Sequence, residues 1–463
     1  MGIQAPNATA KPAGAARPSR LAAWKHRLEN WRWNFSTPRF LLYLAFGAAA
    51  WSVFAFGGVY FWVFIPAYAL LDIGLLLWAV QLSRGRQRLR PDPLLLPILA
   101  VLAWITIQWL WISPVPGRTL TALLHGLGAA AIYFLVSQNY QARVDNVWMS
   151  RRLAILCGAL AWLGLVEWGS GSNGIYWHFH YLLAKPFGPF VNRDNFAACM
   201  DMLLPGSVLQ AWHARSRPDR ALLWALIPAV GVADVVLSRS LSGLLVLIVE
   251  AIWTLWLVQR WRRRKPDASG AAGSRAPGAA SSSGKSPWLV AGFCLLLFVI
   301  VSFSGLAPQT LRVMHLQSQA STQQRIALDH STLALWRQHP WTGWGLGTWQ
   351  PVYYRYNHLY LNAVIEYAHD DWLQWLAETG LIGSLLALLG LGLFASRLTS
   401  LSHASRWGEK LRWMAAMGIA SVLLTSLVQF NLHIPAILLL AGLLSGTAAA
   451  PIIPRRSDTE GVH

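Results

Sequence analysis

Charged residues and cysteines are scarce in this chain of 463 residues. Asp, Glu, Lys and Arg make up 12% of the sequence and hydrophobic residues 55%, whereas a soluble domain carries about 25% charged residues. The scarcity of charge excludes an ordinary soluble fold, because the apolar surface exceeds what one water-soluble core can bury. The few cysteines lie within long apolar stretches, which argues against a disulfide framework or a zinc site. They are Cys157, Cys199 and Cys294.

Long apolar stretches are abundant, and they predict an all-α integral membrane protein. We expect about twelve transmembrane helices, because that many stretches are long enough to cross about 30 Å of hydrocarbon. Several contain Gly, Pro or an acidic residue, so one or two can be re-entrant instead. The predicted spans are residues 39–56, 58–80, 93–112, 119–137, 152–168, 196–213, 220–236, 241–258, 288–306, 380–397, 411–430 and 433–451.

The net charge of +19 reports orientation rather than nucleic-acid binding. Of the 38 Lys and Arg residues, 30 fall on one side of the predicted spans and 8 on the other. By the positive-inside rule the richer side is cytoplasmic. Both termini are therefore expected in the cytoplasm, and no nucleic-acid partner is expected.

Two connections are much longer than the others. Residues 259–287 begin with a basic cluster and continue in Gly, Ala and Ser, which is typical of a flexible linker. Residues 307–379 are external, rich in Trp, Tyr and Leu, and show helical periodicity around a turn-rich centre, which argues against disorder. The predicted organisation is a basic cytoplasmic arm (1–38), spans one to eight (39–258), a flexible basic cytoplasmic loop (259–287), span nine (288–306), a large external loop (307–379), spans ten to twelve (380–451) and a cytoplasmic tail (452–463).

The external loop ends in a histidine followed by two acids. Asp370 or Asp371 suits a helix N-cap, and Asp371 with Gln374 resembles a capping box. We expect the neighbouring carboxylates to raise the proton affinity of His369, as a general base requires; the alternative is a hydrogen-bonded structural histidine. On a continuous helix Glu378 would face away from His369, so we expect it to orient the helix or to bind an arginine.

The glycine-rich segment 340–347, PWTGWGLG, could suggest a phosphate cradle. It lacks the strand-to-helix context of a dinucleotide fingerprint and the Gly-Lys-Ser/Thr ending of a Walker loop. We therefore predict a tight turn flanked by interfacial tryptophans.

External arginines are rare and stand at interpretable places. Arg193 begins the sixth span, Arg239 precedes the eighth, and Arg325 lies in the large external loop. Arginine binds phosphate oxygens through two parallel hydrogen bonds, and helix N-termini beside Arg193 and Arg239 add further donors. The alternative is snorkelling or a local ion pair, for example with Asp194.

Acidic residues inside predicted spans favour a different class of protein. Asp72, Asp201 and Glu250 would be costly in lipid, and such residues often mark a proton or ion path. A polysaccharide or lipid-linked sugar transporter, or a flippase, is thus an alternative, although the acids can simply bond to neighbouring helices. His178 and His180 could form half of a metal site, but no suitable partner is near in sequence, and we predict no metal site.

Three segments together resemble the O-antigen ligase and O-antigen polymerase superfamily of polytopic glycosyltransferases. They are GPFVNRDNFAACMDMLLP (188–205), SRSLSG (238–243) and the run from QQRIALDHS to AETGLIG (323–383). One departure is Asp370, where the family usually has Asn or Ser. These residues are comparable N-caps, but the added negative charge can change donor binding or the pH optimum.

The resemblance implies metal-independent transfer of a glycan from polyprenyl (undecaprenyl) pyrophosphate to a hydroxyl at the periplasmic face of a bacterial inner membrane, without a cofactor. The role would be O-antigen or exopolysaccharide polymerase, which we slightly prefer, or ligase to the lipid A core of lipopolysaccharide; a protein O-oligosaccharyltransferase is the third alternative. We count a chain-length regulator among the partners that such a polymerase would have. The implied catalytic residues are His369, Arg239 and Arg193. Those implied for pyrophosphate and glycan binding are Arg193, Arg239, Arg325, Asn195, Trp344 and Tyr354, with Asp370 and Glu378 in support.

Overall fold

The computed structural model describes residues 37–142, 144–172, 174–181, 185–263, 308–356, 365–400 and 406–450. Several predictions fall wholly or largely outside these residues. They are the basic arm 1–38, the loop 259–287, the span 288–306 with Cys294, and the tail 452–463.

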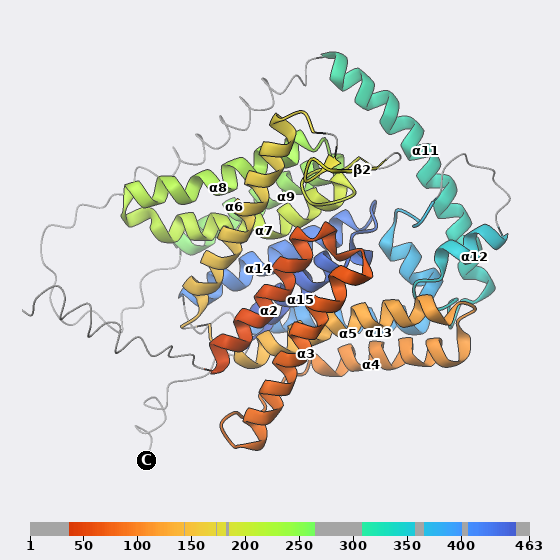
Figure 1. Ribbon diagram of the computed structural model, residues 1–463, viewed down its shortest axis with the longest axis horizontal. Helices are drawn as coiled ribbons and strands as arrows, with labels where there is room; N and C mark the ends of the chain where they lie inside the picture. Colours follow the sequence, from red (N-terminus) through yellow and green to blue (C-terminus); the bar gives the residue numbers. More distant parts are fainter. Residues whose placement is uncertain are drawn as a thin grey trace, which may run out of the picture.

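The described chain is almost entirely helical, with one small β-hairpin (Figure 1). Its helices are α2 (Thr37–Phe54), α3 (Phe61–Ser83), α4 (Leu95–Ile107), α5 (Pro116–Asn139), α6 (Asn146–Gly169), α7 (Arg193–His213), α8 (Pro218–Leu237), α9 (Leu241–Arg263), α11 (Pro308–Gln338), α12 (Trp349–Tyr356), α13 (Asp371–Ser400), α14 (Arg406–Thr425) and α15 (Pro435–Ala449). Short helical turns are η1 (Phe56–Gly58), η2 (Gln108–Ile112), η3 (Ala214–Ser216) and η5 (Asn431–His433). Strands β1 (Gly174–Ile175) and β2 (Phe179–His180) pair antiparallel, with Gly174 opposite His180.

Every predicted span that falls on described residues coincides with a helix. Among the described residues, seven helices are long and apolar enough to cross a membrane: α3, α4 with η2, α5, α6, α8, α9 and α13. α2 and α15 are apolar but shorter. These apolar helices agree with the prediction of an all-α membrane protein, while the count of twelve spans stays a prediction. α7 and α14 are long but fall outside the apolar set, in keeping with the charged residues that they contain.

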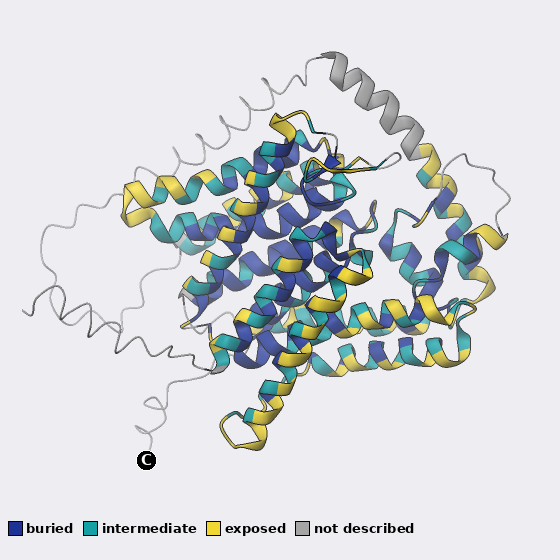
Figure 2. Ribbon diagram, in the orientation of Figure 1, coloured by how far each residue is buried: buried dark blue, intermediate teal, exposed yellow. Residues whose placement is uncertain are grey.

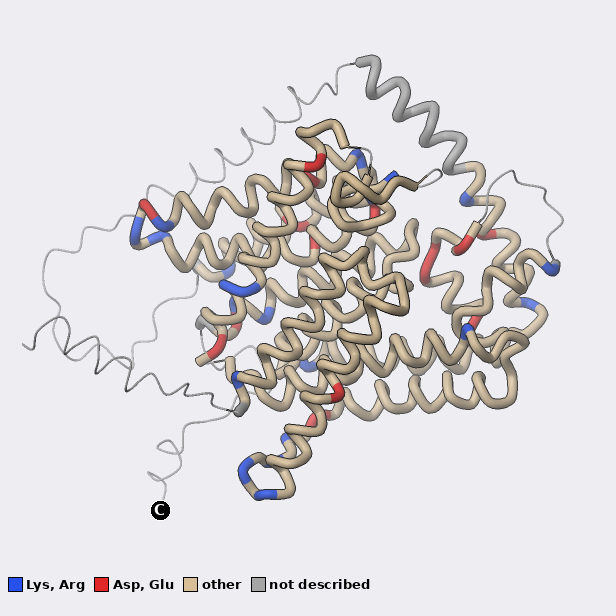
Figure 3. The backbone as a smooth tube through the Cα atoms, in the orientation of Figure 1, with Lys and Arg blue, Asp and Glu red and all other residues tan. Residues whose placement is uncertain are grey.

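Apolar side chains cover the outer faces of several helices, as a lipid-facing surface requires. Leu96 on α4 is 74% exposed and Leu222 on α8 is 66% exposed. Buried residues concentrate instead around α7, α14 and α15 (Figure 2). Charged residues leave long stretches of the helices free of either sign (Figure 3). The molecule therefore presents apolar surface outward over much of its height.

α7 lies at the centre of the largest buried cluster, in contact with α6, α8 and α14. Small residues let these helices approach closely. A Cβ on Gly418 of α14 would stand 2.6 Å from the carbonyl oxygen of Met202 on α7, so the two backbones touch. This close packing holds the first turn of α7, with Arg193, at a fixed place.

The described part of the segment 307–379, which we predict to be external, forms a second, smaller core. The predicted helical periodicity is confirmed by α11, whose Leu328 and Leu335 are buried. They pack with the buried Trp349 and Tyr353 of α12. α11 also contacts α13, so that this layer is attached to the membrane helices at the right of Figure 1.

Two arginines close the end of α15. Nε of Arg412, a buried side chain on α14, donates to the carbonyl of Ala448 at 2.7 Å, and its Nη2 donates to the carbonyl of Ala450 at 3.0 Å. Nε of Arg397 on α13 donates to the carbonyl of Ala449 at 2.9 Å. The last carbonyls of a helix have no partner within the helix, and a cation there also opposes the negative end of the helix dipole. These contacts join α13, α14 and α15.

Arg412→Met should lower the free energy of unfolding by about 3 kcal/mol, because two buried carbonyls lose charged donors while the side-chain volume is kept. The measurement is thermal unfolding in detergent, followed by tryptophan fluorescence. Arg86→Met, at an exposed position after α3, is the matched control and should stay within about 0.5 kcal/mol. Equal stability of the two variants would contradict the role given to Arg412.

Candidate functional site

α13 is interrupted at Gly380, and a glycine loop fills the interruption. Gly380 has φ of 66° and ψ of −171°, and Gly343 in the loop has φ of 64°. A Cβ on Gly380 would stand 2.3 Å from the carbonyl oxygen of Trp341, and one on Gly343 would stand 2.3 Å from that of Glu378. Both positions therefore require glycine, for backbone conformation and for space.

Backbone hydrogen bonds join the two segments in both directions. The amides of Trp344 and Gly345 donate to the carbonyls of Ala377 and Glu378, and the amides of Leu381 and Ile382 donate to those of Pro340 and Trp341. The predicted tight turn is confirmed, with positive φ at Gly343, Gly345 and Gly347. Two of its amides bind carbonyls of α13, which agrees with the prediction of a turn and not a phosphate cradle.

Gln108 supports the interruption from the other side. Its buried Nε2 donates to the carbonyls of Thr342 and Glu378 at 2.7 and 2.8 Å. It lies in η2, a π-helical turn that ends α4, and such turns often occur at functional sites. Gln108 was not predicted, since one glutamine in an apolar span gives no signal of a partner more than 200 residues away.

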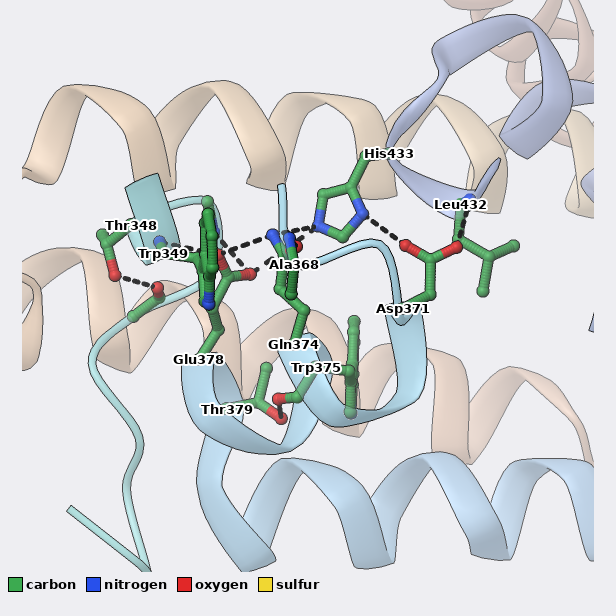
Figure 4. Close-up of polar contacts among 12 residues, drawn as sticks. Thr348, Trp349, Ala368, Asp371, Gln374, Trp375, Glu378, Thr379, Leu432 and His433 are labelled. Carbon is green, nitrogen blue, oxygen red and sulfur yellow. Dashed lines mark hydrogen bonds and ion pairs between the residues drawn. The ribbon is translucent and has the colours of Figure 1, made fainter. Parts of the chain in front are cut away.

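The carboxylate of Glu378 holds the end of the glycine loop (Figure 4). Its Oε2 accepts from the amide of Gly347 at 3.0 Å, and its Oε1 accepts from the amide of Trp349 at 2.8 Å and from Nε2 of Gln374 at 3.2 Å. The side chain is 1% exposed. The expected arginine partner was wrong, because the described contacts are with amide groups and His433. Glu378 orients the loop as well as the helix.

Asp370 caps α13, as predicted for one of the two acids. Its Oδ1 accepts from the amide of Leu373 at 2.9 Å. The predicted capping box of Asp371 with Gln374 was wrong. Oε1 of Gln374 accepts from the amide of Ala368 at 2.9 Å, and Asp371 turns toward the connection between α14 and α15. Burial raises the pKa of Asp370 more than its bonds to backbone amides lower it.

His433 in η5 lies between two carboxylates, and sequence reasoning missed it. Its Nδ1 is 2.6 Å from Oδ1 of Asp371, and its Nε2 is 3.8 Å from Oε2 of Glu378. The side chain of His433 is 16% exposed, so both carboxylates contact it in a largely buried place. In the sequence His433 is a lone histidine at the first position of the last predicted span, which gives no signal of a partner.

His369 stands just before Asp370 with φ of 61°, a left-handed backbone that turns the chain into α13. Its ring meets the ring of Phe430 edge-on at 5.1 Å. Its Nδ1 is buried without a hydrogen-bond partner. The fold therefore leaves this ring nitrogen without a hydrogen bond, which is unusual for a buried polar atom.

The expected rise in the proton affinity of His369 was wrong. Burial of the ring and the positive charge of Arg325 lower its pKa. The charges of Asp194 and Asp371 and the side chain of Gln429 act in the opposite direction but do not compensate. The lowered pKa favours the neutral ring, which is the state that accepts a proton.

The same charge interactions bring together segments that are far apart in sequence. Arg325 of α11 and Asp194 of α7 both act on His369. Arg193, next to Asp194, is half-buried at the first position of α7. Oδ1 of Asn192 caps this helix by accepting from the amide of Asp194 at 2.9 Å. Two of the three predicted arginines thus belong to elements that reach the surroundings of His369.

Asn195 and Arg239 are placed differently. Asn195 is 3% exposed in the first turn of α7, and its Oδ1 has no hydrogen-bond partner. Arg239 is exposed in the turn between α8 and α9, with φ of 57°. Ser240 caps α9 from this turn, since its Oγ accepts from the amide of Gly243 at 3.4 Å. Described contacts do not join Arg239 to His369, so its catalytic role stays a prediction.

The predicted aromatic residues divide into two kinds. Trp344 packs against the external core, and its indole N–H donates to the carbonyl of Leu335 at 3.0 Å, which gives it a structural place. Tyr354 is 47% exposed, and its hydroxyl accepts from the amide of Ile365 at 2.6 Å. Trp341 is 64% exposed. Tyr354 and the additional Trp341 are therefore exposed, whereas Trp344 is packed.

Gly380→Ala should destabilise the protein by at least about 2 kcal/mol, because the left-handed backbone is strained by a Cβ and the added atom meets a carbonyl. Thermal unfolding in detergent measures this loss. Gly392→Ala is the control on the same helix, where a Cβ meets nothing within 4 Å. It should be neutral or stabilise by up to about 1 kcal/mol. Similar behaviour of the two variants would contradict the close contact.

Comparison with known proteins agrees with this arrangement. Residues 225–388 match the family model described as O-Antigen ligase. The match includes Arg239 and His369 and leaves out Arg193 and His433. No curated protein matches the chain. The match over this part of the chain supports the resemblance to the O-antigen ligase and polymerase superfamily that the sequence predicted.

Proposed function

We propose that this protein transfers a glycan from a polyprenyl pyrophosphate to an acceptor hydroxyl at the periplasmic face of a bacterial inner membrane. The family match supports a membrane glycan ligase or polymerase in general. The domain boundaries, the cytoplasmic termini and the external position of the site are part of the same proposal, and the split of Lys and Arg supports them.

The observation that carries the proposal is a buried histidine that has an unpartnered ring nitrogen and on which the charge of Arg325 acts. The pKa of His369 is lowered by burial and by Arg325, and its buried Nδ1 is unpartnered. A base must be unprotonated to act, and a departing pyrophosphate needs positive charge nearby. In the proposal His369 supplies the base and Arg325 the positive charge.

The step balances with these groups alone. The acceptor oxygen forms a bond to the anomeric carbon of the donor while the bond from that carbon to the pyrophosphate oxygen breaks. The hydroxyl proton goes to His369, and the electron pair leaves with the pyrophosphate. Arg325 and Arg193 would stabilise the negative charge that develops on the leaving group, with Arg239 as the third proposed contact.

The acceptor remains one of three hydroxyls: a second lipid-linked glycan, the lipid A core or a protein serine or threonine. All three fit the same chemistry. Polymerase of an O-antigen or exopolysaccharide is our preference, as in the sequence analysis. Mass spectrometry of the products, after one polyprenyl-pyrophosphate glycan is supplied with each acceptor, separates these outcomes.

The three acids of the transporter alternative lie on three different helices. Asp72 is exposed on α3, which packs against α2 and α5. Asp201 and Glu250 are buried on α7 and α9, where Glu250 accepts from Oγ of Ser421 at 2.5 Å. The described contacts do not join Asp72 to the other two acids.

His369→Ala should lower kcat by about 100-fold or more, because the proposed base is removed. The assay is transfer of glycan from a polyprenyl pyrophosphate by the purified protein. His178→Ala, at an exposed position in the β-hairpin, is the control and should retain activity. Normal turnover of His369→Ala would overturn the assignment of the base, and transport without product would overturn the function.

Arg325→Gln should move the acid limb of the pH profile of kcat/KM to higher pH. Arg325 lowers the pKa of His369, so its removal lets the ring protonate at higher pH and the active neutral form is lost earlier as pH falls. Arg337→Gln, in the exposed last turn of the same helix, should leave the limb in place. A shift to lower pH in Arg325→Gln would contradict the proposed interaction.

A further inference from the structure

His433 lies outside the family match and outside the site that the sequence predicted. We propose that it is a positioning residue that joins both carboxylates of α13 to the connection between α14 and α15, and thereby holds His369 in place. The proposal rests on the proposed function for its kinetic test. Its structural test does not depend on that function.

On one side, His433 completes the attachment of Asp371. Nδ1 of the ring is 2.6 Å from Oδ1 of Asp371. Oδ2 of the same carboxylate accepts from Oγ of Ser426 and from the amide of Leu432, both at 2.8 Å. The Asp371 amide donates to the carbonyl of Ser426 at 2.9 Å. The start of α13 is therefore bonded to residues at both ends of the connection.

On its other side, the ring reaches the loop that carries His369. Nε2 of His433 is 3.1 Å from Nε2 of Gln374. Gln374 in turn accepts from the amide of Ala368, the residue before His369, and donates to Oε1 of Glu378. The imidazole of His433 therefore contacts both Gln374, which binds the residue before His369, and Glu378, which binds the glycine loop (Figure 4).

Stacked rings provide a second connection between the two histidines. Tyr367 stacks on Phe430 with ring centres 4.5 Å apart, and it lies 5.1 Å from the ring of His433. Phe430 meets His369 at 5.1 Å. Phe430 and His433 belong to the same connection, so movement of that connection would remove the ring that covers His369.

The groups that face each histidine determine the expected pH effect. His433 faces Asp371 and Glu378 of α13 and the ring of Tyr367, and its charge acts on His125 of α5. The groups that act on the pKa of His369 are Arg325 of α11, Asp194 of α7, Asp371 of α13 and Gln429 of the connection between α14 and α15. If the connection loosens, the burial that lowers the pKa of His369 is reduced, and this pKa rises.

The test is His433→Phe, which keeps an aromatic ring beside Tyr367 and removes both polar contacts. We expect kcat to fall by about 10- to 100-fold with KM within about twofold, because His369 is misplaced rather than lost. The acid limb of kcat/KM should move to higher pH. Hydrogen exchange, measured by mass spectrometry on peptides covering 365–372 and 426–434, should become faster. His433→Gln retains a donor for Asp371 and should show smaller effects in the same directions.

His178→Phe, the same substitution in the exposed hairpin, should change none of these quantities. Wild-type kinetics and exchange in His433→Phe would overturn the proposal, as would lower activity with an unchanged acid limb and unchanged exchange. If the wild-type protein transfers no glycan but the two peptides of His433→Phe exchange faster, the proposed function fails and the positioning role stands.

Discussion

The structure depends on the contact between two stretches of backbone, one in the external loop and one at the interruption of α13. Gly343 and Gly380 each leave the space that the other segment needs. The freed carbonyls of α13 are not left unsatisfied, since the loop amides, Gln108 and the indole of Trp104 donate to them. Buried backbone groups require such partners. The segment that contains Gly343 therefore packs into the interruption of α13.

Two buried carboxylates, one at each end of the first part of α13, bind this helix to two other segments. Glu378 fixes the glycine loop, Asp371 fixes the connection between α14 and α15, and His433 contacts both. His369 comes shortly before the first residue of α13, with its backbone in a left-handed conformation. For the base that we propose, fixed surroundings of this kind would keep the ring buried without a change of shape during the reaction.

Local patterns in the sequence were enough to predict the helices, the tight glycine turn and the cap at Asp370, because each depends on neighbouring residues. The partners of Glu378 and Asp371 could not be predicted, since they are backbone amides and a histidine from distant segments. The pKa of His369 was predicted in the wrong direction for the same reason. Nearby carboxylates are visible in sequence, whereas burial and the charge of Arg325 arise only when α11 folds against α13.

The arginines at the end of α15 have a consequence for how the protein keeps its orientation. Arg397 and Arg412 belong to the side that we expect in the cytoplasm, and they are also donors to the last carbonyls of that helix. A charge that directs insertion is needed only once, during synthesis. Here the same charges remain in use as hydrogen-bond donors in the folded molecule. A substitution that weakened the topological signal would at the same time loosen three helices, so selection for stability would preserve the signal.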